Sequence, residues 1–205
     1  MILKQRYRFC LRFIPDYLVA LIIGIPLGVL FFLFVLVGRI KIQGYARVIR
    51  FAVRGKVIIA ANHPSMLETF LIPPLFFPWY LISQRFFVWS VPDQRLLRPS
   101  LRWLFWFGRC VTIDRSNRKS TKPTLDQLTK ILQHNGVVVI HPEGGRTFKG
   151  DSFLLRGDRG IRRFLSGVPS LARNTDATIL PLWVSGTDVV MPGGTHIPRM
   201  MRSRI

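Results

Sequence analysis

The chain has 205 residues, of which 30 are Lys or Arg and 10 are Asp or Glu, so its formal net charge is +20 although 49% of its residues are apolar. This length allows one domain with a hydrophobic core and excludes two ordinary domains together with a membrane anchor. Because the charge accompanies long apolar segments, the composition disfavours a disordered chain or a nucleic-acid binder and favours a protein held against anionic lipid.

The two cysteines, Cys10 and Cys110, are far apart in the sequence, and neither has a second Cys or a His at metal-ligand spacing. The sequence therefore predicts neither a disulfide framework nor a zinc site. This cysteine usage fits a reducing compartment.

An apolar helix is the first element that the sequence predicts. Residues 17–38 carry no charge, and at about 1.5 Å per residue such a helix spans about 30 Å of hydrocarbon. Pro26 removes a backbone donor, which predicts a kink. Both flanks are basic and favour the cytoplasmic side. A single span is the simpler expectation, and a kinked hairpin entering one leaflet is the alternative. A cleaved signal peptide is disfavoured, because residues 37–41 match a cleavage site poorly.

Short apolar runs and helical patterns alternate through the rest of the chain. Strands are predicted at residues 57–61, 111–113, 137–140 and 178–184, and helices at residues 94–107, 121–134 and 159–172. Continuous apolar runs are typical of strands that are buried on both faces. The alternation predicts an α/β fold with a mixed, largely buried sheet flanked by helices.

The helix predicted at residues 94–107 mixes three arginines with aromatic and aliphatic side chains. This composition fits a helix at a membrane interface, where rings lie at headgroup depth and arginine meets phosphate. It fits equally well a helix with an ordinary core face and a solvated basic face.

A candidate general base follows the first strand after the apolar helix. His63 precedes Pro64, which keeps the histidine out of the helical region and suits the first position of a helix, so a helix is predicted to begin near Pro64. Glu68, in the second turn of that helix, can then fold back toward His63. A carboxylate in that place fixes the imidazole tautomer and stabilises the imidazolium. The alternative is a histidine with a structural role at a strand end.

Two further strand ends carry polar groups. Residues 108–115 end in Arg115, and residues 137–140 run into His141 and the segment HPEGGRT. Gly144 and Gly145 allow backbone amides to approach a ligand closely, and Arg146 can form a two-pronged bond with phosphate. Ligands of α/β proteins gather at such strand ends.

Four ordered blocks resemble those of the 1-acylglycerol-3-phosphate and glycerol-3-phosphate acyltransferases. They are NHPSMLE, GRCVTIDR, HPEGGRT and ILPLWVSGT, and together they cover residues 56–187. The resemblance implies that His63 is the base and that Glu68 is the acid beside it. The substrate-binding residues that it implies are Asn62, Ser65, Arg115, Glu143, Gly144, Gly145, Arg146 and Pro181.

The chain departs from the family pattern at three positions. Glu68 stands where Asp is usual, His141 where Phe is usual, and Gly145 where Thr is usual. The first change reshapes the pair with His63 without removing its charge, and the other two predict a different acceptor pocket. His141 is also a second candidate base. Family members usually continue with another strand beyond the position of Ile205, so a truncated chain is one alternative and a complete chain the other.

The resemblance implies an enzyme that moves a fatty acyl group from acyl-CoA or acyl-carrier protein to a lysophospholipid hydroxyl, with 1-acylglycerol-3-phosphate as the expected acceptor. Neither a metal nor a cofactor is required, since a thiolate is a good leaving group near neutral pH. Residues 1–45 are then the membrane anchor and residues 46–205 an acyltransferase domain on the cytoplasmic face. The alternatives are another lysolipid, an aminolipid or a glycolipid as acceptor, or a non-catalytic membrane-surface protein of the same fold. No nucleic-acid partner is expected, and the oligomeric state stays open.

Overall fold

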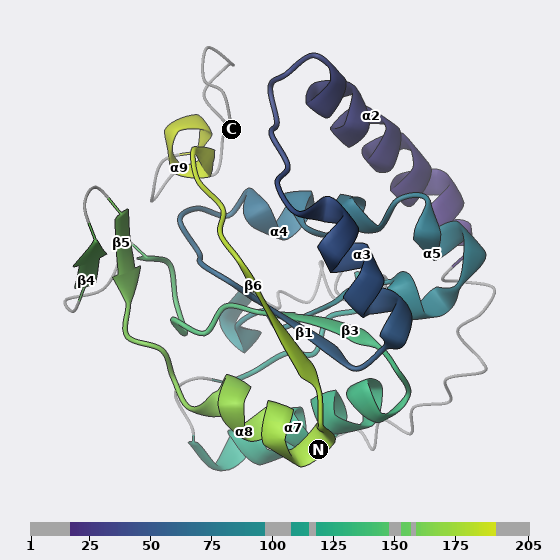
Figure 1. Cartoon of the computed structure of the whole chain (residues 1–205). Helices are drawn as coiled ribbons and strands as arrows, with labels where there is room; N and C mark the ends of the chain where they lie inside the picture. Colours follow the sequence, from purple (N-terminus) through teal and green to yellow (C-terminus); the bar gives the residue numbers. More distant parts are fainter. Residues whose placement is uncertain (1–16, 97–107, 115–117, 148–152, 157–158, 192–205) are drawn as a thin grey trace.

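The computed structural model describes residues 17–96, 108–114, 118–147, 153–156 and 159–191 (Figure 1). Its strands are β1 (Val57–Ala61), β2 (Trp89–Ser90), β3 (Val137–Ile140), β4 (Phe153–Arg156), β5 (Arg159–Arg162) and β6 (Thr178–Leu182). Its α-helices are α2 (Ile25–Leu36), α3 (Tyr45–Arg54), α4 (Glu68–Leu71), α5 (Trp79–Ile82), α7 (Arg118–Gln133), α8 (Gly167–Thr175) and α9 (Thr187–Val190). A π-helical turn, η2 (Ala20–Gly24), and three 3-10 turns, η3 (Pro73–Phe76), η4 (Gln84–Phe86) and η5 (Gln94–Leu96), complete the described elements.

Four parallel strands form the central sheet in the order β2-β3-β1-β6. The apolar strands β1 and β3 are its two middle strands, and their register pairs Val57 with Val137. Since all four strands run the same way, the carboxyl ends of β1 and β3 lie side by side at one edge of the sheet. Antiparallel pairing occurs in the separate β4–β5 hairpin. The predicted α/β fold with a sheet flanked by helices is confirmed.

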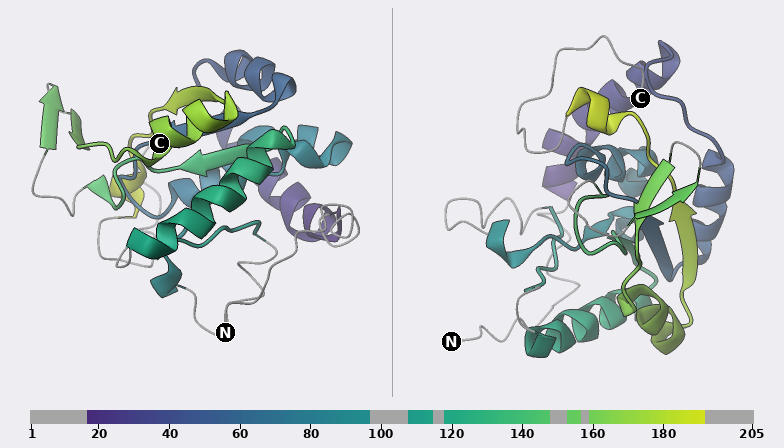
Figure 2. Two further views of the ribbon diagram at one scale, coloured as in Figure 1. Left: turned by 90° about the horizontal axis from the view of Figure 1, so that it is seen from below. Right: turned by 90° about the vertical axis from the view of Figure 1, so that its left-hand side faces the viewer.

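Helices cover both faces of this sheet (Figures 1 and 2). Alternate residues of β1 point to opposite faces: Val57 and Ile59 pack into a cluster with α3 and the segments around α5, whereas Ile58 packs against α7 and α8. All three side chains are at most 2% exposed. The sheet is therefore held rigidly from both sides, which fixes the strand ends in place.

The N-terminal apolar segment forms one helix, Tyr17–Leu36, which is long and apolar enough to cross a membrane. Directly before Pro26, the N–H of Ile25 bonds to the carbonyl of Ala20, five residues back. Proline supplies no N–H for the regular bond at this level, so the helix accommodates it with a π-turn. A kink was predicted at Pro26; the structure has a π-turn there within one continuous helix.

This apolar helix packs along the rest of the domain. The hydroxyl of Tyr80 donates a hydrogen bond to the carbonyl of Gly24 at 2.5 Å. A Cβ added to Gly28 would lie 2.5 Å from the ring of Phe77, so only glycine allows this close approach. One turn further on, Phe32 contacts Tyr45 of α3 with ring centroids 6.0 Å apart. The opposite side of the helix is exposed and apolar, with Leu18, Leu21, Ile22, Leu30, Leu33 and Leu36 at its surface.

One predicted helix is wrong in its first half. Residues 159–172 were expected to be helical, but Arg159–Arg162 is strand β5 and the helix begins only at Gly167. The antiparallel pairing with β4 and a bond from the Arg162 N–H to the buried carboxylate of Glu143 hold this segment extended. These tertiary contacts override the local helical pattern.

Two predicted strands differ in length from those observed. In place of a continuous strand at residues 111–113, two isolated parallel bridges join Cys110 to Ser90 and Ile113 to Asp93. Strand β6 stops at Leu182, two residues before the predicted end, because the side chain of Asn62 takes up the backbone groups of Val184. Of the helix predicted at residues 94–107, the structure describes the 3-10 turn η5, and residues 97–107 lie outside the described part.

Candidate active site

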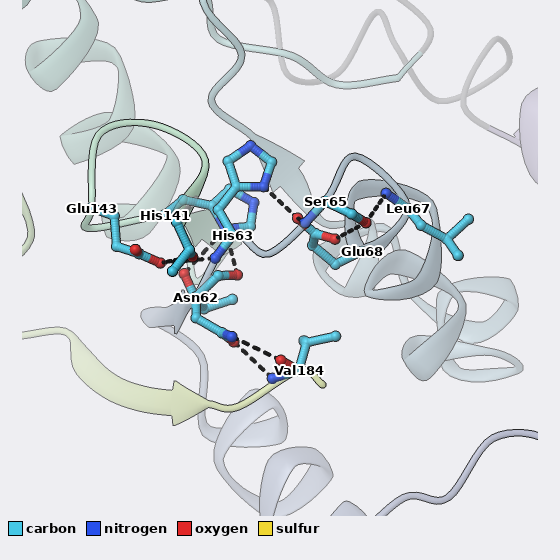
Figure 3. A network of polar contacts seen from close by, with 10 residues as sticks. Asn62, His63, Ser65, Leu67, Glu68, His141, Glu143 and Val184 are labelled. Carbon is cyan, nitrogen blue, oxygen red and sulfur yellow. Dashed lines mark hydrogen bonds and ion pairs between the residues drawn. The ribbon is translucent and has the colours of Figure 1, made fainter. Parts of the chain in front are cut away.

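The adjacent ends of β1 and β3 bring two histidine rings together (Figure 3). His63 follows β1 by two residues, and His141 follows β3 directly. Their rings stack with centroids 4.2 Å apart and an interplanar angle of 14°. The two strand ends that the sequence singled out thus form one site.

His63 and Glu68 form a pair in which the imidazole Nδ1 contacts the carboxylate Oε1. The carboxylate is an acceptor, so neutral His63 carries its proton on Nδ1 and leaves the lone pair on Nε2. The Glu68 side chain is fully buried, whereas 12% of the His63 side chain is exposed. The imidazole therefore faces the solvent side of the site and the carboxylate supports it from within.

The local backbone explains how Glu68 reaches back. The predicted helix start at Pro64 is wrong: residues 64–67 form a turn, and α4 begins only at Glu68. Within this turn the Ser65 hydroxyl accepts the Leu67 N–H at 2.9 Å and donates to Glu68 Oε2 at 2.9 Å, while the Ser65 N–H approaches Oε1 at 3.2 Å. The turn folds the glutamate over the histidine. Because α4 has only four residues, its dipole contributes little to the site.

The charge state of Glu68 follows from these contacts. Burial alone would raise the pKa of its carboxyl, but the hydrogen bond and charge of His63, together with the hydrogen bonds of the turn and Ser65, outweigh burial and hold the pKa below its ordinary value. Glu68 is therefore a carboxylate at neutral pH. A buried anion in contact with Nδ1 is the arrangement that stabilises an imidazolium.

The side chain of Asn62 forms hydrogen bonds with the backbone of Val184. Its amide nitrogen donates to the Val184 carbonyl at 2.7 Å and its amide oxygen accepts the Val184 N–H at 2.7 Å. Beyond the last backbone pair of β1 and β6, these two side-chain bonds continue to hold the two segments together. Asn62 and Ser65 are both buried, and their side chains bond to protein groups.

The carboxylate of Glu143 holds the backbone of His63 in place through a hydrogen bond. Its buried carboxylate accepts the His63 N–H at 2.9 Å, the Thr147 hydroxyl at 2.8 Å and the Arg162 N–H at 3.0 Å. The Thr147 N–H in turn donates to the His63 carbonyl at 2.8 Å. The main-chain groups on both sides of His63 are thus fixed by the segment after β3. Glu143, expected to bind the acceptor, is occupied by protein donors.

The remaining predicted substrate-binding residues lie at different depths. Gly144 has a φ of +66°, and a Cβ added there would lie 2.5 Å from Leu165, so the turn requires glycine. Gly145 and Arg146 follow it in the same loop and are partly exposed. Pro181 is exposed on β6, the edge strand, where its missing N–H costs no ladder bond. Arg115 lies outside the described residues.

The sequence analysis assigned no role in the site to several residues that build it. Val184 and Arg162 contribute backbone groups only, and Leu165 closes the loop after β3 through a bond from its N–H to the Pro142 carbonyl at 2.8 Å. Any residue type supplies such groups, so composition cannot reveal them. Within the described part of the chain, no group of three or more His, Cys, Asp or Glu side chains is placed to hold a metal ion.

The sequence of this chain matches a known family and a known protein. Residues 39–185 match the family model described as Acyltransferase. The chain belongs to the acyltransferase family, which confirms the resemblance read from the four blocks and supports its being an enzyme. It is 27% identical over 138 residues to a 1-acyl-sn-glycerol-3-phosphate acyltransferase of Chlamydomonas reinhardtii. That match covers 67% of this chain and 36% of the relative, so the chain corresponds to about a third of the relative's length.

Proposed function

We propose that this protein transfers a fatty acyl group from a thioester, acyl-CoA or acyl-carrier protein, to the free hydroxyl of a lysophospholipid. The observation that carries the proposal is the His63–Glu68 pair, whose carboxylate is buried and whose imidazole is partly exposed at the sheet edge. The expected acceptor is 1-acylglycerol-3-phosphate, giving phosphatidic acid. The function named for the Chlamydomonas relative supports this choice.

In the proposed reaction, Nε2 of His63 removes the proton from the acceptor hydroxyl as its oxygen attacks the thioester carbonyl carbon. The new C–O bond forms, and the negative charge passes to the carbonyl oxygen. As the tetrahedral intermediate collapses, the C–S bond breaks, and the imidazolium returns the proton to the leaving thiolate. Glu68 stabilises the imidazolium between the two steps.

The direct test is turnover of radiolabelled acyl-CoA by the purified full chain with a panel of lysophospholipids, monoacylglycerol, an aminolipid and a glycolipid. A parallel series uses acyl-carrier protein as the donor. Product with lysophosphatidic acid above all other acceptors supports the proposal. No product with any acceptor and either donor overturns it and favours a non-catalytic membrane-surface protein.

Arg146 is proposed to bind the acceptor phosphate, with Arg115 as the second cation. Arg146→Ala should raise the acceptor KM by roughly 30-fold, since a charge-assisted hydrogen bond is worth about 2 kcal/mol. The donor KM should change little. Arg146→Lys should recover part of the loss, because it keeps the charge without the planar fork. Arg163→Ala, an exposed cation after β5, is the matched control.

An unchanged preference of Arg146→Ala for lysophosphatidic acid over monoacylglycerol would contradict the phosphate role. Gly145, where the family usually has Thr, would then be the first position to examine for a different acceptor.

Membrane association is proposed to occur with the apolar helix lying in one leaflet against the domain, on the cytoplasmic face. Contacts at Gly24, Gly28 and Phe32 join the central part of the helix to the domain. A helix held in this way along its side cannot cross the bilayer without carrying α5 and its neighbours into the hydrocarbon. Residues 70–82 carry no charge, and Phe70 and Ile82 are exposed, which suits a shallow interfacial position.

The basic side of α3 should contribute to this association. Arg47, Arg50 and Arg54 are exposed on α3, which shares its core cluster with the apolar helix. Replacing all three with Gln should weaken binding to vesicles containing phosphatidylserine by roughly 10²-fold, at about 1 kcal/mol per residue. Binding to neutral vesicles should not change.

The control for the α3 variant removes the same charge from the other layer. Lys122 and Lys130 on α7 and Arg173 on α8 are exposed on the opposite side of the sheet. If their replacement by Gln weakened anionic-vesicle binding as much as the α3 variant, net charge alone would explain the effect and the proposed orientation would be wrong. Co-sedimentation with vesicles measures both variants.

A further inference from the structure

His141 occupies a position where the family pattern has phenylalanine, and it lies against the ring of the proposed base (Figure 3). The two imidazoles are nearly parallel, with centroids 4.2 Å apart. This contact follows from the sheet, because β1 and β3 are neighbours in register, Ala60 pairing with Ile140. His141 therefore lies beside the proposed base.

The hydrogen bonds of His141 define its tautomer. Its Nδ1 lies 3.1 Å from the carbonyl oxygen of Ala61 and 3.2 Å from that of Asn62. Carbonyl oxygens accept but do not donate, so Nδ1 carries a proton and is shared between them. The His141 ring is thus tied to the same two residues that lead into His63.

The environment of His141 also keeps it uncharged. Burial, followed by the neighbouring His63, lowers the pKa of His141 to about 4, although Glu68 and the two carbonyls act in the opposite direction. A group with this pKa is a poor base at neutral pH. Glu68, the carboxylate that supports an imidazolium, contacts His63. These points favour His63 over His141 as the base.

We infer that His141 is a positioning residue, whose ring, fixed to the Ala61 and Asn62 carbonyls, holds the imidazole of His63 in the plane that directs Nδ1 to Glu68 and Nε2 to the acceptor hydroxyl. This inference rests on the proposed function. The contacts of His63 then come from distinct directions: Glu143 holds its N–H, Glu68 holds the ring edge, and His141 supports the ring face.

Substitutions at position 141 separate the contact of the aromatic face with His63 from the hydrogen bond of the N–H to the carbonyls. Phenylalanine at position 141 keeps an aromatic face under His63 but cannot donate to the carbonyls, whereas leucine fills the space with neither property. His141→Leu should lower kcat by roughly 10- to 100-fold, because a small misplacement of a reacting group costs this much. The KM values for donor and acceptor should stay within about threefold of the wild-type values. His141→Phe should recover most of the loss in kcat.

The experiment compares kcat, both KM values and the melting temperature of wild type, His141→Phe, His141→Leu and the control His134→Leu. His134 is exposed at the end of α7. Spectra of the full chain labelled with ¹⁵N-histidine report the tautomer of His63 without any substrate. The wild type and His141→Phe should show His63 in a single Nδ1–H form, and His141→Leu a mixture of the two tautomers.

Equal kcat values for wild type and His141→Leu overturn the inference, as does a single His63 tautomer in His141→Leu. A kcat for His141→Phe as low as that of His141→Leu also overturns it, since the aromatic face would then not matter. If the folded wild type transferred no acyl group to any acceptor, the proposed function would fail, and the ¹⁵N spectra would still decide whether His141 orients His63.

Discussion

Replacing His63 with alanine is expected to abolish acyl transfer, with kcat falling by roughly 10²- to 10⁴-fold toward the background rate. Nδ1 of His63 is engaged by Glu68, so Nε2 is the atom left to remove the hydroxyl proton. Turnover is measured with radiolabelled acyl-CoA and lysophosphatidic acid. Vesicle binding should be unchanged, because His63 lies in the polar site and not on the apolar helix.

A second substitution distinguishes loss of the base from loss of the folded structure as the cause of inactivity. Alanine leaves the fully buried Glu68 carboxylate without its imidazole partner, and removing one partner of a buried pair costs about 3–5 kcal/mol of stability. His63→Asn retains an N–H that can face Glu68 but supplies no base, so it should be better folded and equally inactive. His134→Leu is the control for losing a histidine elsewhere. A fully active His63→Asn would transfer the base role to His141.

Glu68→Gln is expected to reduce kcat by roughly 10²-fold or more while leaving both KM values nearly unchanged. The amide can occupy the space of the carboxylate between His63 and Ser65, but it has no negative charge to stabilise the imidazolium. The pKa of Glu68 lies below its ordinary value, so the wild-type residue is ionised throughout the neutral range. The loss should therefore persist at every pH tested between about 6 and 8.

Glu68→Asp tests whether the charge or the length of the side chain is decisive. The family pattern has Asp at this position, so the shorter carboxylate should retain substantial activity. Asp126→Asn, which removes an exposed carboxylate from α7, serves as the control. Activity of Glu68→Gln equal to that of Glu68→Asp would show that the buried charge does not assist the reaction.

The sequence by itself determined the central strands and the chemical groups at their ends. Residues 57–61 and 137–140 were predicted with the bounds observed for β1 and β3, because a strand buried on both faces must be apolar at every position. His63 and Glu68 were identified from the resemblance of the block NHPSMLE to the family's first block, whereas the helix start predicted from Pro64 was wrong. The missing N–H of Pro26 also acts locally, and it led to the prediction of a kink where the structure has a π-turn.

Only the tertiary structure decided what most of the polar residues in the blocks do. Asn62, Ser65 and Glu143 direct their side chains to protein groups, and their partners lie up to 122 residues away along the chain. Backbone N–H and carbonyl groups occur at nearly every position, so the sequence does not mark which of them a buried side chain will meet.

The stack of His141 on His63, the strand at Arg159–Arg162 and the packing of the apolar helix on the domain were likewise decided by tertiary structure. The stack depends on the register of β1 with β3, and the packing of the helix depends on the close approach of Gly28 to Phe77. The strand depends on its pairing with β4 and on the bond to the Glu143 carboxylate. A local sequence pattern reflects only the conformational preference of its own segment. These contacts depend instead on strand pairing and on the close approach of other elements. Long-range packing therefore overrode or completed the local signal.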